Sequence, residues 1–473
     1  MRRTNIVATL GPVSSDPDTL EKLIRAGMNV ARLNYSHGTH EEHRQRLQNV
    51  HAAARKLGTA VACLQDLSGP KIRTGHIAPP EGVLLKAGAR FILTTDDVEG
   101  KAERVSTGYK SLPADVKAGE RILLDDGLME LEVESVDGCE VVTRVVSGGH
   151  LKSNKGINLP GTKLSVSSLT DKDRSDALHG IRIGVDYMAL SFVRTAADVE
   201  ELKEFLAAKG RPDLPVIAKI EKPEAIHNLD GILAVCDGVM VARGDLGVEL
   251  PAEQVPMIQK NIIFEAYRRG LIVITATQML ESMIHNPRPT RAEASDVANA
   301  ILDGSDAVML SGETAVGKHA VETVATMARI ASHTESKNAH LPWHWPDGMS
   351  LLDRHSTARA VAKAACRAAD ELDARYVVTF TESGSTAILL SHFRPKCPII
   401  AFTPSQDVYR RLALPWGVTP VMSVHYTSFE KMLDDGLGVL VHLGIVDKGD
   451  LVVVIFGTTL TPGATNIMKV HEF

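Results

Sequence analysis

Four ionic residues near the middle of the chain have the types and the spacing needed to bind a metal ion and a phosphoryl group. Lys219 and Glu221 end the apolar run VIAKI. Arg243 and Asp245 directly follow the apolar run GVMVA. Two carboxylates suit a hard divalent cation such as Mg²⁺ or Mn²⁺, and a lysine ammonium can meet the negative charge of a phosphoryl group. The alternative is a pair of salt bridges at two strand ends.

The elements that would position these residues alternate strand and helix along most of the chain. Short apolar runs such as VIAKI and GVMVA are typical of parallel strands that are buried on both faces. We count eight strand-helix units, three before position 68 and five after position 166, which predict an α/β fold with a closed (β/α)₈ TIM barrel. The carboxyl ends of the strands form the active site in such a barrel.

Two regions interrupt or follow this alternation. Between residues 69 and 166, short strand-like runs separated by Gly, Pro and Asp predict a small inserted β-barrel domain that could act as a lid. Beyond a Trp- and Pro-containing linker at 341–350, renewed alternation predicts a three-layer α/β domain. The predicted domains are 1–68 and 167–340 for the two parts of the barrel, 69–166 for the lid and 350–473 for the C-terminal, effector-binding domain.

Polar side chains recur at the carboxyl ends of the predicted barrel strands, whereas the strand starts are mainly Gly, Pro and apolar residues. In addition to the opening four residues, these strand ends hold Arg32, Asn34, Ser36, Asp66, Ser191, Thr277 and Ser311. A barrel active site requires this asymmetry and a purely structural barrel lacks it. We therefore expect the residues to form one site.

The composition limits the class of protein. The 473 residues are 44% hydrophobic and 23% charged, as in ordinary globular proteins, and the net charge of −6 argues against a general nucleic-acid binder. The five cysteines lie far apart without a CxxC pair, which indicates free thiols in a reducing compartment. We find no signal peptide and no run of membrane-spanning length, so we expect a cytoplasmic protein without a membrane partner.

Several long motifs resemble the pyruvate kinase family. They are NVARLNYSHGTH (29–40), GINLPG (156–161), KIE (219–221), MVARGDLG (240–247), ATQMLESM (276–283) and PRPTRAEASDVANAILDGSDAVMLSGETA (287–315). The resemblance covers the whole chain. It implies an allosteric glycolytic homotetramer that moves the phosphoryl group of phosphoenolpyruvate to ADP, giving pyruvate and ATP.

Two other functions are compatible with parts of this pattern. A metal-dependent lyase or aldolase that acts through a pyruvate enolate also needs paired carboxylates on a TIM barrel, but it does not need Lys219, Arg73 or Lys155. A barrel that has lost catalysis and only senses metabolites is the third possibility. The charged positions of the predicted site are all filled, which argues against this third function.

The resemblance assigns roles to individual residues. Glu221 and Asp245 would bind Mg²⁺ or Mn²⁺, and Lys219 would stabilise the phosphoryl group during its transfer. The other assignments are Arg32 for the substrate phosphate, the backbone N–H groups of Arg243, Gly244 and Asp245 for the substrate carboxylate, Arg73 and Lys155 for nucleotide phosphates, and Thr277 and Ser311 for a water relay at the enolate. Thr277 would also contact the substrate.

The segment DLSGPKIRTG departs from the family pattern at a monovalent-cation site. Members that require K⁺ bind it with oxygens at the positions of Asn34, Ser36, Asp66 and Leu67, and they usually carry Glu at the position of Lys71. Like charges a few ångströms apart repel by roughly 4 kcal/mol at an effective dielectric constant of 20. We therefore expect that K⁺ is not required. The alternative is that Lys71 points to solvent.

The loop TESGSTA at 381–387 has the composition of a phosphate-binding loop, because it combines hydroxyls and a glycine before a predicted helix. Its candidate residues are Thr381, Ser383, Gly384, Ser385 and Thr386. In the family this loop and residues 458–465 form an allosteric site for phosphorylated metabolites. Because Glu382 stands where members that respond to fructose bisphosphate carry a positive or neutral residue, we expect a monophosphate effector, such as a sugar monophosphate or AMP. The alternative is an ordinary helix cap.

Overall fold

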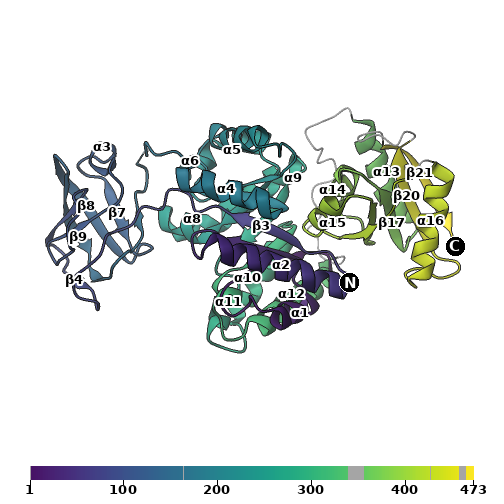
Figure 1. Ribbon diagram of the computed structural model, residues 1–473, viewed down its shortest axis with the longest axis horizontal. Coiled ribbons are helices and arrows are strands. Elements are labelled where there is room, and N and C mark those ends of the chain that lie inside the picture. Colours follow the sequence, from purple (N-terminus) through teal and green to yellow (C-terminus); the bar gives the residue numbers. More distant parts are fainter. Residues whose placement is uncertain (1, 163, 339–355, 427, 458–464) are drawn as a thin grey trace.

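Three parts of the chain lie in a row in the computed structural model (Figure 1), which describes residues 2–162, 164–338, 356–426, 428–457 and 465–473. A strand-rich part lies at one end, a barrel surrounded by helices lies in the middle, and an α/β part lies at the other end. The predicted fold class is confirmed. The domain borders near 68 and 166 stay predictions, and the border at 340–350 lies outside the described residues.

Eight parallel strands close the central barrel in the order β1-β16-β15-β14-β13-β12-β3-β2. Three of them precede the inserted part and five follow it, as predicted. Their bounds are β1 (Asn5–Thr9), β2 (Val30–Asn34), β3 (Ala62–Asp66), β12 (Tyr187–Leu190), β13 (Val216–Ile220), β14 (Gly238–Ala242), β15 (Ile272–Ala276) and β16 (Ala307–Leu310).

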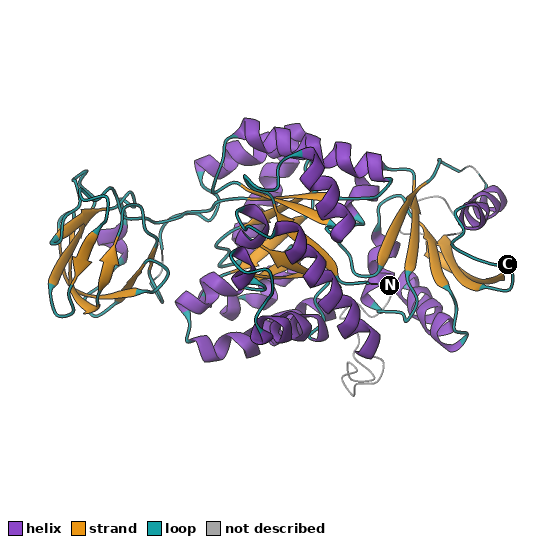
Figure 2. Cartoon of the chain, turned by 90° about the horizontal axis from the view of Figure 1, so that it is seen from below, coloured by secondary structure: helices purple, strands orange, loops and turns teal. Residues whose placement is uncertain are grey.

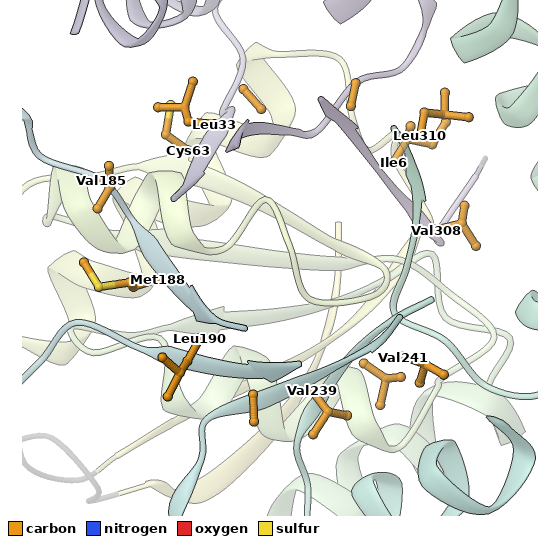
Figure 3. Packing of buried hydrophobic residues seen from close by; sticks show 14 of the residues in the cluster. Ile6, Leu33, Cys63, Val185, Met188, Leu190, Val239, Val241, Val308 and Leu310 are labelled. Atoms are coloured by element: carbon orange, nitrogen blue, oxygen red, sulfur yellow. The ribbon is translucent and has the colours of Figure 1, made fainter. Parts of the chain in front are cut away.

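The barrel strands bury both of their faces. Side chains such as Ile6, Met188 and Val239 lie on the outer side of the strands (Figure 3), where they pack in one cluster with the surrounding helices. Alternate residues such as Leu64 and Ile217 fill the interior of the barrel. Full burial of one such aliphatic side chain contributes about 1.5–3 kcal/mol to folding. This double burial explains why the strands read as continuous apolar runs rather than as alternating ones.

The helices of the barrel begin at caps that the sequence carries. Thr39, Thr170 and Thr290 each form a capping box, with an acidic side chain three residues later. The helices are α1 (Pro17–Ala26), α2 (His40–Leu57), α4 (Asp171–Ile183), α5 (Ala196–Ala208), α6 (Pro223–His227), α7 (Leu229–Val235), α9 (Val255–Arg268), α10 (Arg291–Leu302) and α12 (Ala320–Asn338). None of the described helices is long and apolar enough to cross a membrane.

Two short helices that the sequence analysis does not predict start directly at barrel strand ends. These are α8 (Arg243–Glu249) after β14 and α11 (Gly312–Ala315) after β16. Because α8 begins at Arg243, its first turn holds Gly244 and Asp245. The ionic residues after β14 therefore lie at a helix N-terminus rather than in an irregular loop.

The inserted part is joined to the barrel by two extended segments (Figure 2). These segments pair with each other through a bridge between Arg73 and Gly156. Beyond this bridge, six strands form one sheet in the order β11-β7-β8-β9-β5-β6, and β10 and β4 form a second. The elements are β4 (Val83–Leu85), β5 (Arg90–Thr94), β6 (Arg104–Ser106), α3 (Leu112–Asp115), β7 (Arg121–Leu124), β8 (Met129–Asp137), β9 (Glu140–Ser147), β10 (Gly149–Leu151) and β11 (Ile157–Asn158).

The C-terminal part is a five-stranded sheet in the order β19-β18-β17-β20-β21, with buried clusters on both faces. Its antiparallel edge strand β21 is not predicted by the sequence analysis. The predicted linker at 341–350 lies outside the described residues. The elements are α13 (Thr357–Glu371), β17 (Tyr376–Phe380), α14 (Ser385–His392), β18 (Ile399–Thr403), α15 (Gln406–Arg411), β19 (Val418–Met422), α16 (Phe429–His442), β20 (Leu451–Gly457) and β21 (Thr465–Glu472).

The C-terminal part contacts the barrel at the starts of the strands, opposite the predicted site. Leu414 packs in the cluster that fills the barrel interior. Two ion pairs also join the parts, because Arg394 pairs with Asp306 and Arg410 pairs with Asp186. Both aspartates lie immediately before a barrel strand. The barrel is therefore in direct contact with the domain that carries the loop at 381–387.

Candidate active site

Lys219 lies at the centre of a buried ionic cluster at the carboxyl ends of the barrel strands. Its Nζ lies 2.9 Å from Glu221 Oε1 and 3.3 Å from Asp66 Oδ1, and it donates to Ser191 Oγ at 2.7 Å. Burial lowers the pKa of Lys219, but Asp66 and Glu221 outweigh this effect and raise the pKa above its ordinary value. Lys219 is therefore a permanently charged group at neutral pH.

Asp245 lies close enough to Glu221 to influence the ionisation of Glu221. Burial raises the pKa of Glu221, Lys219 opposes this shift, and the Asp245 carboxylate raises the pKa further. The second carboxyl oxygen of Glu221 accepts the N–H of Phe192 at 2.6 Å, and Phe192 has a φ of 57°. Such a backbone conformation is strained for a bulky residue. A divalent cation between the two carboxylates would relieve their repulsion, so these residues fit a metal ion.

Arg32 is fixed by two buried partners. Its Nε donates to Asp66 Oδ2 at 2.6 Å, and its Nη1 donates to the hydroxyl of Thr9 at 2.9 Å. Thr9 lies at the end of β1, and the sequence analysis does not identify it. The position at the carboxyl end of a barrel strand was the signal that could have indicated it. With its orientation fixed in this way, Arg32 presents a cation to the site without a large loss of side-chain entropy.

A cavity of about 80 Å³ brings most of the predicted residues together. Ser311 is not among the residues that line it. Its N–H donates instead to Glu313 Oε2 at 2.6 Å, after the end of β16. The residues that line the cavity are Arg32, Asn34, Ser36, Lys71, Phe192, Lys219, Glu221, Met240, Ala242, Asp245, Ala276, Thr277 and Met309.

The side chain of Arg243 contacts the loop after β15 and does not line the cavity. Its guanidinium donates to the carbonyl of Thr277 at 2.6 Å and pairs with Asp296 at 2.6 Å. The N–H of Gly244 donates to Thr277 Oγ1 at 2.7 Å, and Thr277 has a φ of 70°. Arg243 thus holds the strained Thr277 in place, and Thr277 in turn holds the start of α8.

A cleft of about 410 Å³ runs from Asp245 to the hinge of the inserted part. Arg73 and Lys155 both line it, as the resemblance implies, and the Nζ of Lys155 lies 2.8 Å from Asp125 Oδ1. Lys71 and Phe192 line both the cleft and the cavity. A molecule in the cleft can therefore approach the ionic cluster around Lys219.

Three further residues link the barrel to the inserted part, and the sequence analysis does not identify them. Lys222 pairs with Glu249 at the end of α8. The same carboxyl oxygen of Glu249 accepts the side-chain N–H of Asn158 at 3.0 Å. Asn158 and Lys222 both line the cleft. The sequence signals were that Asn158 lies in the motif GINLPG and that Lys222 directly follows the motif KIE; Glu249 lies in neither motif, and the three residues are far apart in the chain.

The oxygens proposed for a monovalent cation are already engaged by protein groups. Both carboxyl oxygens of Asp66 contact cationic side chains, and the carbonyl of Leu67 accepts the hydroxyl of Ser191 at 2.7 Å. Asn34 and Ser36 line the cavity together with Lys71. Burial and the nearby Lys219 lower the pKa of Lys71, and this effect outweighs the carboxylates of the site, which raise the pKa. The side chain of Lys71 thus belongs to the electrostatic surroundings of this site.

The loop at 381–387 borders a second cavity, of about 80 Å³, in the C-terminal part. Thr381, Ser383, Ser385 and Thr386 line this cavity together with aromatic residues, and Gly384 has a φ of 86° at the start of α14. No lysine or arginine lines the described part of this cavity. The Glu382 carboxylate lies 3.7 Å from His425 Nδ1. Of the partner segment expected at 458–465, only Thr465 lies within the described residues.

Comparison with known proteins identifies the family. The family models described as "Pyruvate kinase, barrel domain" and "Pyruvate kinase, alpha/beta domain" match residues 1–324 and 359–471. The chain is 49% identical to a pyruvate kinase of Geobacillus stearothermophilus, over 99% of this chain and 80% of that protein. It is 48% identical to pyruvate kinase 2 of a Synechocystis species, over 99% and 79% of the two chains. A crystal structure of a pyruvate kinase from Cryptosporidium parvum superposes with a TM-score of 0.92 at 36% identity, covering 100% of this chain and 96% of that chain.

The fold and the ionic cluster define a TIM-barrel phosphotransferase with a lid and a C-terminal α/β domain. The chain belongs to the pyruvate kinase family. It is a glycolytic transferase that moves the phosphoryl group of phosphoenolpyruvate to ADP, giving pyruvate and ATP. Enzymes of this family generally use Mg²⁺. The lyase or aldolase alternative is not favoured.

Proposed function

We propose that Lys219, Arg32, Glu221 and Asp245 carry out the phosphoryl transfer. The observation that carries this proposal is the position of the Lys219 ammonium within 3.3 Å of two buried carboxylates, in the same cavity as Arg32. Arg32 binds the substrate phosphate, and Lys219 stabilises the negative charge that spreads over the transferred group. The test is pyruvate formation from phosphoenolpyruvate that depends on both ADP and Mg²⁺.

Glu221 and Asp245 are the proposed ligands of Mg²⁺ or Mn²⁺. When the ion is bound, its positive charge would offset the negative charge of the phosphoryl group. Asp245 also lines the cleft toward the lid, so it lies between the cavity and the proposed nucleotide site. Arg73 and Lys155 bind the ADP phosphates there. If the inserted part closes over the cleft by bending at the segments that carry Arg73 and Lys155, it would exclude water during the phosphoryl transfer.

The first turn of α8 is proposed to bind the carboxylate of phosphoenolpyruvate through the N–H groups of Arg243, Gly244 and Asp245. The hydroxyl of Thr277 accepts the N–H of Gly244 in the structure, so Thr277 has to rotate when substrate binds. Its hydroxyl is then free to orient water near the enolate. Ser311, directly after β16, is the second residue proposed for this water relay. Arg243 itself acts as a positioning residue.

We predict full activity with Mg²⁺ when every monovalent cation is replaced by a bulky quaternary ammonium. The reason is the Lys71 ammonium, which shares the cavity with Asn34 and Ser36 and supplies a fixed positive charge. Lys71→Glu should create a dependence on K⁺, and Lys86→Glu on the lid, outside the cavity and cleft, is the matched control. Strong activation of the unmodified enzyme by K⁺ would refute this prediction.

We propose that the cavity beside the loop at 381–387 binds a phosphorylated metabolite with one phosphate. Hydroxyls and the amides at the start of α14 suit one phosphate, whereas the Glu382 carboxylate and the absence of a lining cation in the described residues disfavour two. A sugar monophosphate or AMP should lower the phosphoenolpyruvate concentration for half-maximal rate. Ser383→Ala with Ser385→Ala should abolish this response, unlike the exposed control Thr419→Ala. Tight activation by fructose bisphosphate alone would contradict the proposal.

The active assembly is proposed to be a homotetramer, on the basis of the family alone. Sedimentation velocity at micromolar concentration would determine the number of chains.

A further inference from the structure

Three potential metal ligands that the proposed mechanism does not use lie together at the start of the barrel strands. His51 belongs to α2, Cys63 belongs to β3, and Asp186 immediately precedes β12. One nitrogen, the sulfur and one carboxyl oxygen from these residues all lie within 4.8 Å of one another. The Nε2 of His51 lies 3.9 Å from Cys63 Sγ. Figure 3 shows Cys63 on the outer side of the barrel, which is the side that faces the helices.

The pairing of two barrel strands fixes this arrangement. The N–H of Cys63 donates to Asp186 Oδ2 at 2.8 Å, and the N–H of Asp186 donates to the carbonyl of Cys63 at 2.9 Å. Cys63 is completely buried and Asp186 is 1% exposed. The relative positions of Cys63 and Asp186 are therefore fixed by the pairing of the two strands before an ion binds.

The ionisation of these residues favours metal binding at His51 and opposes it at Cys63. Burial, together with Arg410 and Arg55, lowers the pKa of His51 to about 4, so its ring is neutral and offers a lone pair at neutral pH. Burial raises the pKa of Asp186 to about 6, against the effect of Arg410. Burial and the nearby Asp186 raise the pKa of the Cys63 thiol well above its ordinary value, so a metal ion has to displace the thiol proton when it binds.

A cavity of about 480 Å³ between the barrel and the C-terminal domain reaches the cluster at His51, whereas the buried Cys63 and Asp186 do not line it. His51 and Arg410 both line this cavity. Arg410 belongs to α15, and its Nε donates to Asp186 Oδ1 at 2.8 Å. An ion that enters from the cavity has to compete with this guanidinium for the Asp186 carboxylate.

We propose that His51, Cys63 and Asp186 form a binding site for a thiophilic divalent cation, such as Zn²⁺ or Cd²⁺, and that Arg410 weakens its affinity. Imidazole nitrogen, thiolate sulfur and carboxylate oxygen are the ligands that Zn²⁺ takes in proteins, and three of them leave one position of a tetrahedral site for a fourth ligand. Mg²⁺ prefers oxygen ligands alone, so the ion of the catalytic site does not compete here.

Titration of the full chain with Cd²⁺ in a buffer that contains Mg²⁺ tests this site, because the thiolate-to-cadmium charge-transfer absorption reports only sulfur ligation. We expect a saturable band for one ion per chain. Cys63→Ala should remove the band, and His51→Ala should weaken binding by about 10–100-fold. Cys139→Ser should keep it, since Cys139, in the lid, is the one described cysteine that is not buried. A melting curve of each variant shows whether it is folded.

Arg410→Gln provides the second arm of the test. Removal of the competing guanidinium should tighten Cd²⁺ binding, so that the band reaches half-saturation at a lower Cd²⁺ concentration. Arg411→Gln is the matched control, because Arg411 pairs with Asp213 at 2.7 Å and not with Asp186. The proposal is overturned if the unmodified chain gives no band, if the band persists in Cys63→Ala, or if Arg410→Gln does not bind more tightly than Arg411→Gln.

Discussion

Lys219→Met is expected to lower kcat by about 10³–10⁵, the range found for cationic groups that act in the transition state of phosphoryl transfer. The ammonium lies in the cavity with Arg32 and both proposed metal ligands, so its loss removes charge where the phosphoryl group passes. Substrate binding should change far less, because Arg32 and the metal ion still hold the phosphate. Steady-state rates and calorimetric binding of phosphoenolpyruvate would separate the two effects.

The folded state of this variant should survive because both carboxylates keep other partners. Asp66 still pairs with Arg32, and Glu221 still accepts the N–H of Phe192. Lys203→Met is the control, since Lys203 pairs with Asp237 at 2.9 Å on the same barrel but does not line the cavity. A kcat within about tenfold of the unmodified enzyme in folded Lys219→Met would refute the assigned role.

The barrel and the position of its site were predictable from local sequence pattern. Strands buried on both faces read as apolar runs, and the same burial makes every polar residue at a strand end conspicuous. Lys219, Glu221 and Asp66 all follow or end such runs, and the structure places them in contact. These residues are in contact because barrel closure brings together the carboxyl ends of all eight parallel strands, whatever their separation in the chain.

The direction of individual side chains was not predictable in the same way. Arg243 follows β14 and Lys219 lies near the end of β13, yet the guanidinium of Arg243 does not line the cavity and contacts the carbonyl of Thr277 and the carboxylate of Asp296 instead. This orientation depends on the start of α8 at Arg243, and a seven-residue helix has too few residues for a periodic pattern. Thr9 was missed for a related reason, because its role depends on a side chain of the neighbouring strand.

The edge strand β21 shows a further limit of the sequence pattern. Its residues TNIMKVHE pair with β20 over the whole length of that strand, but five of the eight are exposed. An edge strand with one solvated face carries a weak apolar signal. The contact of Asn158 with Glu249 joins residues of two domains, and Lys222 pairs with the same carboxylate, which no local pattern in the chain can indicate.

Asp245→Asn is expected to raise the Mg²⁺ concentration for half-maximal activity at least about tenfold, because changes around metal ligands typically cost 10–100-fold in affinity. Asparagine keeps one oxygen of similar position but loses the negative charge that attracts the ion. Mg²⁺ titrations of activity at saturating phosphoenolpyruvate and ADP would measure the shift. Asp237→Asn, at the opposite end of the same strand, should leave the Mg²⁺ requirement unchanged.

Thermal unfolding distinguishes loss of the metal ligand in Asp245→Asn from a damaged fold. The Asp245 carboxylate raises the pKa of Glu221, which means that the two negative charges repel each other in the metal-free enzyme near neutral pH. Neutralising Asp245 removes this repulsion, so the Tm without metal should stay equal or rise. The increase in Tm on adding Mg²⁺ should shrink, because stabilisation by a ligand follows its affinity. An unchanged Mg²⁺ titration together with an unchanged Tm increase would place the ion away from Asp245.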